Sequence, residues 1–155
     1  MSSRAIAPVL GVVLLVALSA VCAGVIVIVV SDVVDMREVP RVTFEGTLNA
    51  SSNEITLTHT GGDDVSVEPL EMRITVDDEP LRYQPDIPFA SQTGFSTGPS
   101  GPLHAWATGT WSPSTSSSLS LSDSNEPLPD HDSTVVVSIT YDNQPLADIT
   151  LTQEP

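Results

Sequence analysis

Hydrophobic and polar positions divide the chain into two regions with different patterns. Residues 6–30 form a run of 25 residues without a charged side chain. A helix needs roughly 20 apolar residues to cross the hydrocarbon core of a bilayer, which is about 30 Å thick. The run therefore predicts a membrane-spanning helix. We expect the helix to continue to residue 38, because Pro40 disfavours the helical conformation in the residue before it.

Charges on either side of the run predict its orientation. Arg4 is the only charged residue before the run, Asp32 is the first after it, and all 20 acidic residues lie beyond Val30. Positive residues stay on the cytoplasmic side of a membrane. We therefore expect a single-pass protein of the cell membrane with a cytoplasmic N-terminus and residues 31–155 outside the cell.

The sequence also predicts a packing face on this helix. Ala17, Ala20 and Gly24 follow helical spacing on one side, and Ala20 and Gly24 form a small-xxx-small pair. Such pairs let two helix backbones approach closely.

Three general interpretations of this N-terminus compete, and the first two fit the residues poorly. A secretory signal peptide has an apolar core of 7–15 residues before a small-x-small cleavage site, whereas here the apolar run continues well past Ala23. A lipoprotein signal would use Cys22, but the branched Val21 stands where a small residue is preferred. An uncleaved signal anchor fits the hydropathy well.

Beyond residue 40 the pattern changes to the two-residue alternation of β-strands. In residues 53–60, Ile55, Leu57 and His59 fall on one face and threonines on the other. Clusters of glycine, asparagine, aspartate and proline separate such segments, as in turns. We expect strands over 41–48, 53–60, 65–67, 72–76, 81–83, 103–111, 119–121, 134–141 and 146–152, and loops over 84–102, 112–118 and 122–133. This spacing predicts an acidic, antiparallel, sandwich-like all-β extracellular domain over residues 41–155.

Charge and cysteine content restrict the partners of this domain. The chain has five arginines, no lysine and 20 acidic residues, for a formal net charge of −15. Such a surface repels itself unless salt screens it, and the composition resembles that of haloarchaeal proteins. Nucleic acid is excluded as a partner because no basic patch could neutralise phosphates. Because Cys22 is the only cysteine, no intrachain disulfide can form.

The sequence indicates neither catalysis nor a bound metal. It lacks the nucleophile elbow, the zinc-protease helix, the phosphate loop and the dinucleotide fingerprint. We therefore expect no enzyme and no cofactor. His59 stands alone on its strand face, where a histidine is more often packed than a ligand. His131 lies between Asp130 and Asp132, which could hold a divalent ion, but an acidic loop is common at this composition, so no metal site is predicted. The segment 77–79 is likewise interpreted as a solvated turn.

Two features suggest contacts with carbohydrate. Asn49, Ala50 and Ser51 form an N-glycosylation sequon in an expected hairpin loop. Trp106 and Trp111, with Phe95 nearby in the sequence, could form a carbohydrate-binding face, although aromatic residues in a β-domain more often belong to the core.

Residues 4–12 resemble the start of archaeal type IV pilin precursors, particularly the haloarchaeal pilin N-terminal family. The shared features are a leader that ends in a basic and a small residue, here Arg4 and Ala5, and an Ala-Pro-Val-Leu-Gly-Val segment after it. The resemblance implies that a prepilin peptidase cleaves between Ala5 and Ile6, which makes residues 1–5 the leader. Leu10 occupies the position of the glutamate in bacterial pilins, which agrees with the archaeal branch.

A second segment, Ile55–Val65, resembles the Thr-His-Thr-Gly-Gly-Asp region with which the family closes the first hairpin of its soluble domain. The resemblance implies a structural subunit of a type IV pilus-like surface filament that takes part in adhesion. Its helix would pack in the filament core against copies of itself or other pilins. The alternatives are a membrane-anchored binding or envelope protein that never polymerises, and a minor pilin of a related secretion or motility assembly.

Overall fold

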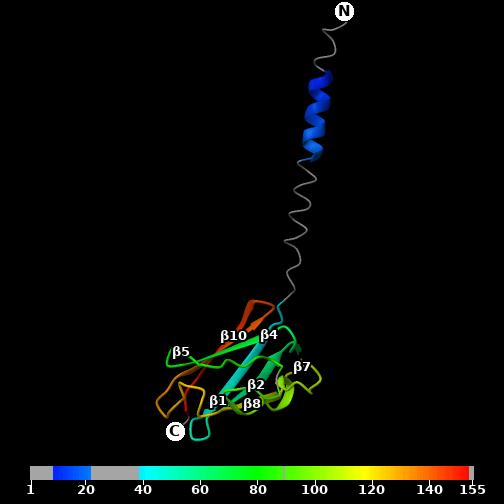
Figure 1. Cartoon of the computed structure of the whole chain (residues 1–155). Helices are drawn as coiled ribbons and strands as arrows, with labels where there is room; N and C mark the ends of the chain where they lie inside the picture. Colours follow the sequence, from blue (N-terminus) through cyan, green and yellow to red (C-terminus); the bar gives the residue numbers. More distant parts are fainter. Residues whose placement is uncertain (1–8, 22–38, 89, 154–155) are drawn as a thin grey trace, which may run out of the picture. The chain divides into compact units, whose positions relative to one another are not determined.

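The computed structural model describes residues 9–21, 39–88 and 90–153 of the chain. The chain divides into two units, residues 1–38 and residues 39–155. In the described residues, the first unit contributes one helix and the second contains all the strands (Figure 1). The second unit is called the β-domain below.

The described helix of the first unit is shorter than the helix that the sequence predicts. It covers residues 9–21, which are 13 residues, and at 1.5 Å per residue it is about 20 Å long. In the described part of the chain, no helix is long and apolar enough to cross a membrane. The predicted membrane-spanning helix is therefore wrong. Two predictions depend on that helix and are wrong with it: the localisation as a single-pass membrane protein, and the description as a transmembrane pilin. Residues 6–8 and 22–38 of the predicted helix lie outside the described residues.

The reason for the error lies in what hydropathy measures. An uncharged run shows that a stretch is apolar, but not how many of its residues form one helix. In the residues that the structure describes, the fold is thus mostly antiparallel sheet with one short α-helix.

Two four-stranded sheets and one two-stranded sheet form the β-domain. The first sheet has the order β1 (Val42–Asn49), β2 (Glu54–Gly62), β8 (Thr115–Leu121) and β6 (Phe95–Thr97). The second has the order β10 (Gln144–Leu151), β9 (Val135–Tyr141), β4 (Leu70–Val76) and β5 (Glu79–Pro80). The small sheet pairs β3 (Val65–Ser66) with β7 (Thr110–Trp111). All these strand pairs are antiparallel.

The alternation seen in the sequence explains the core. Ile55 and Leu57 on β2, and Ile74 and Val76 on β4, are buried, while the residues between them are more exposed. Buried side chains from both large sheets belong to one hydrophobic cluster. The driving force is the removal of this apolar surface from water.

Two tight hairpins have the residues that their turns require. Asp77 and Asp78 connect β4 to β5, and Asp142 and Asn143 connect β9 to β10; all four have φ between 50° and 67°. Two-residue hairpin loops with positive φ at both positions match the twist of the strands that they join, and aspartate and asparagine tolerate this conformation.

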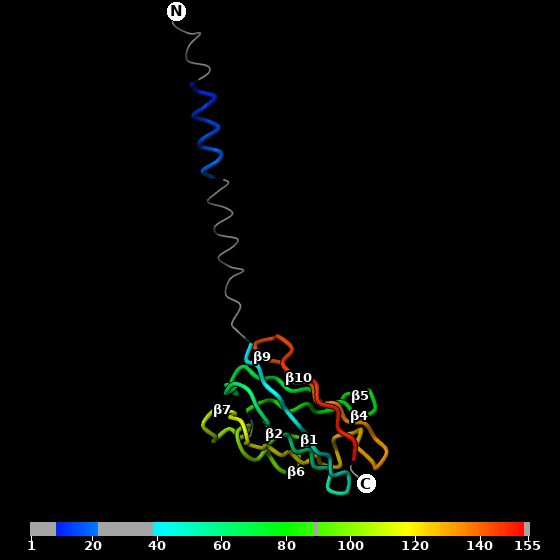
Figure 2. Tube along the Cα trace, turned by 180° about the vertical axis from the view of Figure 1, so that it is seen from behind, coloured from blue at the N-terminus to red at the C-terminus, as the bar shows by residue number. Residues whose placement is uncertain are grey.

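The two large sheets approach each other along β1 and β10 (Figure 2). Leu48 forms a parallel bridge with Gln153, and the Gln153 Oε1 atom accepts a 3.0 Å hydrogen bond from the backbone N–H of Ala50. Gly46 makes this approach close: a Cβ atom there would collide with Leu151 and lie 3.0 Å from Leu57 Cδ2.

The region between β5 and β8 differs from the prediction. The expected strand over 103–111 is wrong: the 3-10 helix η1 (Gly101–Leu103) and turns occupy this region before β7 begins at Thr110. Gly101 and Gly109 have φ of 68° and 76°, which interrupts an extended backbone. The expected loop over 84–102 contains the short β6, and β8 begins at Thr115, within the expected loop over 112–118.

Candidate functional site

The helix over residues 9–21 presents an apolar surface on every side. Nine of its valines and leucines have exposed fractions between 59% and 68%. Its one polar side chain is Ser19, whose hydroxyl donates a 2.9 Å hydrogen bond to the Leu15 carbonyl in the preceding turn. The hydroxyl therefore needs no external partner. This surface, called the apolar helix surface below, is suited to burial against other apolar groups.

Two of the three predicted helix-packing residues lie on the described helix. Ala17 and Ala20 are three residues apart, on neighbouring positions of one side. Gly24, the third, lies outside the described residues, as do the predicted cleavage residues Arg4, Ala5 and Ile6. Their roles remain predictions.

His59 is a packed residue of the core, as the sequence interpretation favours. Its side chain is fully buried; Nδ1 lies 3.2 Å from the Trp111 carbonyl oxygen and Nε2 lies 3.0 Å from that of Gly61. The ring centroid of Phe44 lies 4.9 Å from that of His59 and 4.7 Å from that of Trp111. We call Phe44, His59 and Trp111 the three-ring cluster. Since both imidazole nitrogens face backbone carbonyls, neither faces a site for a ligand.

The Gly-Gly-Asp part of the same motif holds the open end of the first hairpin. Gly62 has φ of 107°, and a Cβ atom there would collide with the Arg41 carbonyl. Asp63 hydrogen-bonds Arg41 twice: its backbone N–H donates to the Arg41 carbonyl over 2.9 Å, and its Oδ2 accepts from the Arg41 N–H over 3.0 Å. The Thr-His-Thr-Gly-Gly-Asp segment thus acts structurally.

This geometry predicts different effects at two adjacent glycines. We expect Gly62→Ala to lower the free energy of unfolding by about 1–3 kcal/mol, because alanine rarely adopts positive φ and its Cβ would strike backbone. Gly61→Ala is the matched control, since a Cβ atom there meets nothing within 4 Å. Urea unfolding of both variants measures the difference. Equal losses would show that the close approach at Gly62 has no energetic consequence.

The acidic segment 130–133 forms a small loop that is stabilised by its own side chains. The Asp130 Oδ1 atom accepts hydrogen bonds from the Ser133 hydroxyl over 2.9 Å and from the Asp132 backbone N–H over 3.0 Å. The Ser133 hydroxyl is the main cause of a lowered pKa for Asp130, and the Asp132 N–H adds to it. Because the folded-state pKa is lowered, this contribution to stability is present above the ordinary carboxyl pKa and is lost as the pH falls.

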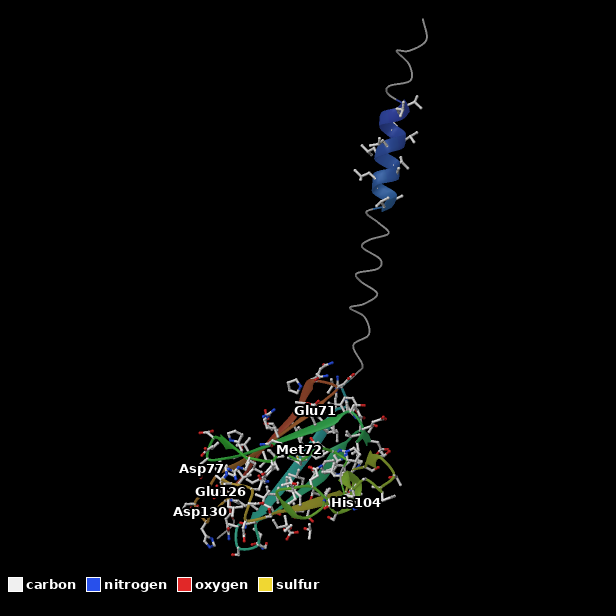
Figure 3. All side chains as sticks on the ribbon, in the orientation of Figure 1. Glu71, Met72, Asp77, His104, Glu126 and Asp130 are labelled. Atoms are coloured by element: carbon white, nitrogen blue, oxygen red, sulfur yellow. The ribbon has the colours of Figure 1, made fainter. Side chains whose placement is uncertain are left out.

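Acidic residues gather at one end of the β-domain without forming a metal centre. Figure 3 shows Asp77, Glu126 and Asp130 at this end and His104 at the other. The Asp77 Oδ1 atom accepts a 2.8 Å hydrogen bond from the Thr134 backbone N–H. This carboxylate oxygen therefore already has a partner within the fold. In the described ranges, no group of three histidine, cysteine, aspartate or glutamate residues could hold a metal ion.

The two tryptophans do not form a common face. Trp111 is fully buried in the three-ring cluster, whereas Trp106 is 86% exposed in the turns between η1 and β7. The backbone N–H of Trp106 donates a 3.1 Å hydrogen bond to His104 Nδ1. The interpretation as core residues is confirmed for Trp111 and wrong for Trp106, and the paired carbohydrate-binding face is also wrong. Trp106 is a single exposed aromatic residue. Its isolation could not be read from the sequence, because it depends on a turn that was expected to be a strand.

Comparison with known proteins assigns neither a family nor a function to the chain. No family model matches the chain, and no curated protein matches it. The resemblance to archaeal type IV pilins, the absence of enzymatic activity, and the suggested partners therefore stay predictions.

Proposed function

We propose that this protein is a structural subunit of a type IV pilus-like filament and that it assembles through its N-terminal helix. The apolar helix surface carries this proposal. Soluble monomers seldom leave such a continuous apolar area exposed, and no polar group of the helix opposes its burial. The resemblance of residues 4–12 to archaeal pilin precursors supports the same function.

The chemistry of the helix favours other copies of itself as the partner. Burying one valine or leucine side chain contributes about 1.5–3 kcal/mol, and a helix that is apolar on every side gains most when several neighbours surround it. The small side chains of Ala17 and Ala20 let a neighbouring backbone approach. The uncharged helix is also where copies of a protein with a net charge of −15 repel each other least. The acidic β-domain would then cover the filament and mediate adhesion.

The first test is the N-terminal sequence of the protein from cells and from sheared filaments. We expect a mature N-terminus at Ile6, because the proposal includes cleavage by a prepilin peptidase after Arg4 and Ala5. Combined Arg4→Glu and Ala5→Glu substitutions should keep the leader on the protein and prevent its appearance in filaments. Ser2→Ala, which leaves the basic and small pair intact, is the control.

Other N-termini would contradict the proposal. An uncleaved protein that never enters filaments would favour the alternative of a binding protein that does not polymerise. The exposed Trp106 is the observation that favours this alternative, since exposed aromatic residues often act as binding anchors. An N-terminus at Cys22 or Ala23 would indicate a secretion signal and contradict both functions.

A further inference from the structure

The glycosylation sequon lies where a transferase could reach it. Asn49 is the last residue of β1, and Ser51 belongs to the turn that connects β1 to β2. Both residues are exposed. A sequon in a buried or central strand would be inaccessible to the transferase. The position of this sequon at a hairpin tip therefore meets the first requirement for modification.

The Asn49 side chain is oriented with its amide nitrogen available. Its Oδ1 atom accepts a 3.3 Å hydrogen bond from the backbone N–H of Ser52. Within the described residues, no hydrogen-bond partner is recorded for Nδ2. The oxygen therefore has a partner within the turn, and the exposed residue leaves its amide nitrogen without a hydrogen bond to the described part of the chain.

A polar groove begins at the same asparagine. Its volume is about 670 Å³; Gly46 and Leu48 line part of it, and its polar lining residues are Thr47, Asn49, Glu54, Thr56, Thr152 and Gln153. The strand register explains four of these: Asn49 pairs with Glu54, and Thr47 pairs with Thr56, so the two pairs are neighbours on the outer face of the first sheet. Hydroxyl, amide and carboxylate groups are the hydrogen-bonding partners that sugar hydroxyls require.

We propose that Asn49 carries an N-linked glycan and that the first sugars of this glycan lie in the polar groove. The donor would be a phosphate-activated, lipid-linked oligosaccharide. Asn49 Nδ2 loses one proton to a base of the transferase and forms a bond to the anomeric carbon. The bond from that carbon to the phosphate oxygen breaks, and its electron pair leaves with the phosphate. This inference does not depend on filament assembly.

The modification is tested on the full chain isolated from the cells that make it. Trypsin cleaves after Arg41 and Arg73, so Asn49 lies in the peptide Val42–Arg73. We expect mass spectrometry to find this peptide heavier by a glycan that maps to Asn49. Ser51→Ala should abolish the added mass, whereas Ser51→Thr, which preserves the sequon, and Ser52→Ala, which lies outside it, should retain it. An unmodified wild-type peptide, or a glycan that persists in Ser51→Ala, would overturn the proposal.

The position of the sugars is tested by thermal unfolding. We expect Ser51→Ala to unfold about 2–4 °C below Ser51→Thr, as for the loss of one modest interaction in a protein of this size. Thr56→Val keeps a residue that favours strands but removes one hydroxyl of the groove. It should lower the melting temperature more in the glycosylated protein than in the Ser51→Ala background. Equal shifts in both backgrounds would show that the sugars do not contact the groove.

Discussion

Leu14→Glu is expected to abolish filament assembly and to leave the β-domain folded. Leu14 lies in the middle of the described helix and is 67% exposed. In a packed bundle its replacement would bury an unpaired carboxylate, with an effective penalty of several kcal/mol for each copy. Because every subunit carries the substitution, the penalty recurs at every contact. Electron microscopy of sheared material and sedimentation of the purified protein measure the result.

The control for this substitution conserves apolar character. Leu14→Met has a similar volume and should assemble normally. The β-domain forms a unit of its own, so the urea unfolding curve of Leu14→Glu should match that of the wild type. Filaments of normal yield in Leu14→Glu would show that the apolar helix surface is not the assembly interface.

The second large effect is expected at His59. His59→Ala removes a fully buried ring that contacts two backbone carbonyls, and it leaves a cavity beside Phe44 and Trp111. Replacing a buried ring with alanine costs about 3–5 kcal/mol, and the carbonyl that loses the imidazole N–H donor adds to this cost. We expect a loss of unfolding free energy in this range, measured by urea denaturation followed through tryptophan fluorescence.

A substitution at His131 provides the comparison for the loss of stability at His59. His131 is exposed, so His131→Ala should change the unfolding free energy by less than about 0.5 kcal/mol. His59→Gln keeps a hydrogen-bond donor but loses the ring that packs against Phe44, so it should fall between the wild type and His59→Ala. A loss at His59 no greater than that at His131 would mean that the three-ring cluster does not hold the first hairpin to β7.

Most hairpins of the β-domain could be predicted because their signals are local. Alternation at Ile55, Leu57 and His59 predicts a strand that the structure places at Glu54–Gly62. The Asp77-Asp78 and Asp142-Asn143 turns are likewise marked by residues that tolerate positive φ. In each case the residues that determine the structure lie within a few positions of it.

The parts that could not be predicted depend on distant residues or on length. The groove at Asn49 includes Thr152 and Gln153, about 100 positions later in the chain, and no local pattern reports this proximity. Exposure of Trp106 depends on how η1 and the turns after it lie on the domain. Hydropathy could not predict the length of the N-terminal helix, because the absence of charge is a property of composition, whereas helix length is a property of the backbone.

Tension on this protein would act first on β1 and β10, the first and last strands of the β-domain. The chain enters the β-domain at Arg41 and forms β1 at once, while Gln153, near the C-terminus, pairs with Leu48 at the far end of β1. A pull between the two ends of the domain therefore acts along the axis of β1. The hydrogen bonds between β1 and β2 lie perpendicular to that axis, so they are sheared together and not unzipped one by one. Rupture must break many bonds at the same time, which favours mechanical resistance in a subunit that is pulled along its length.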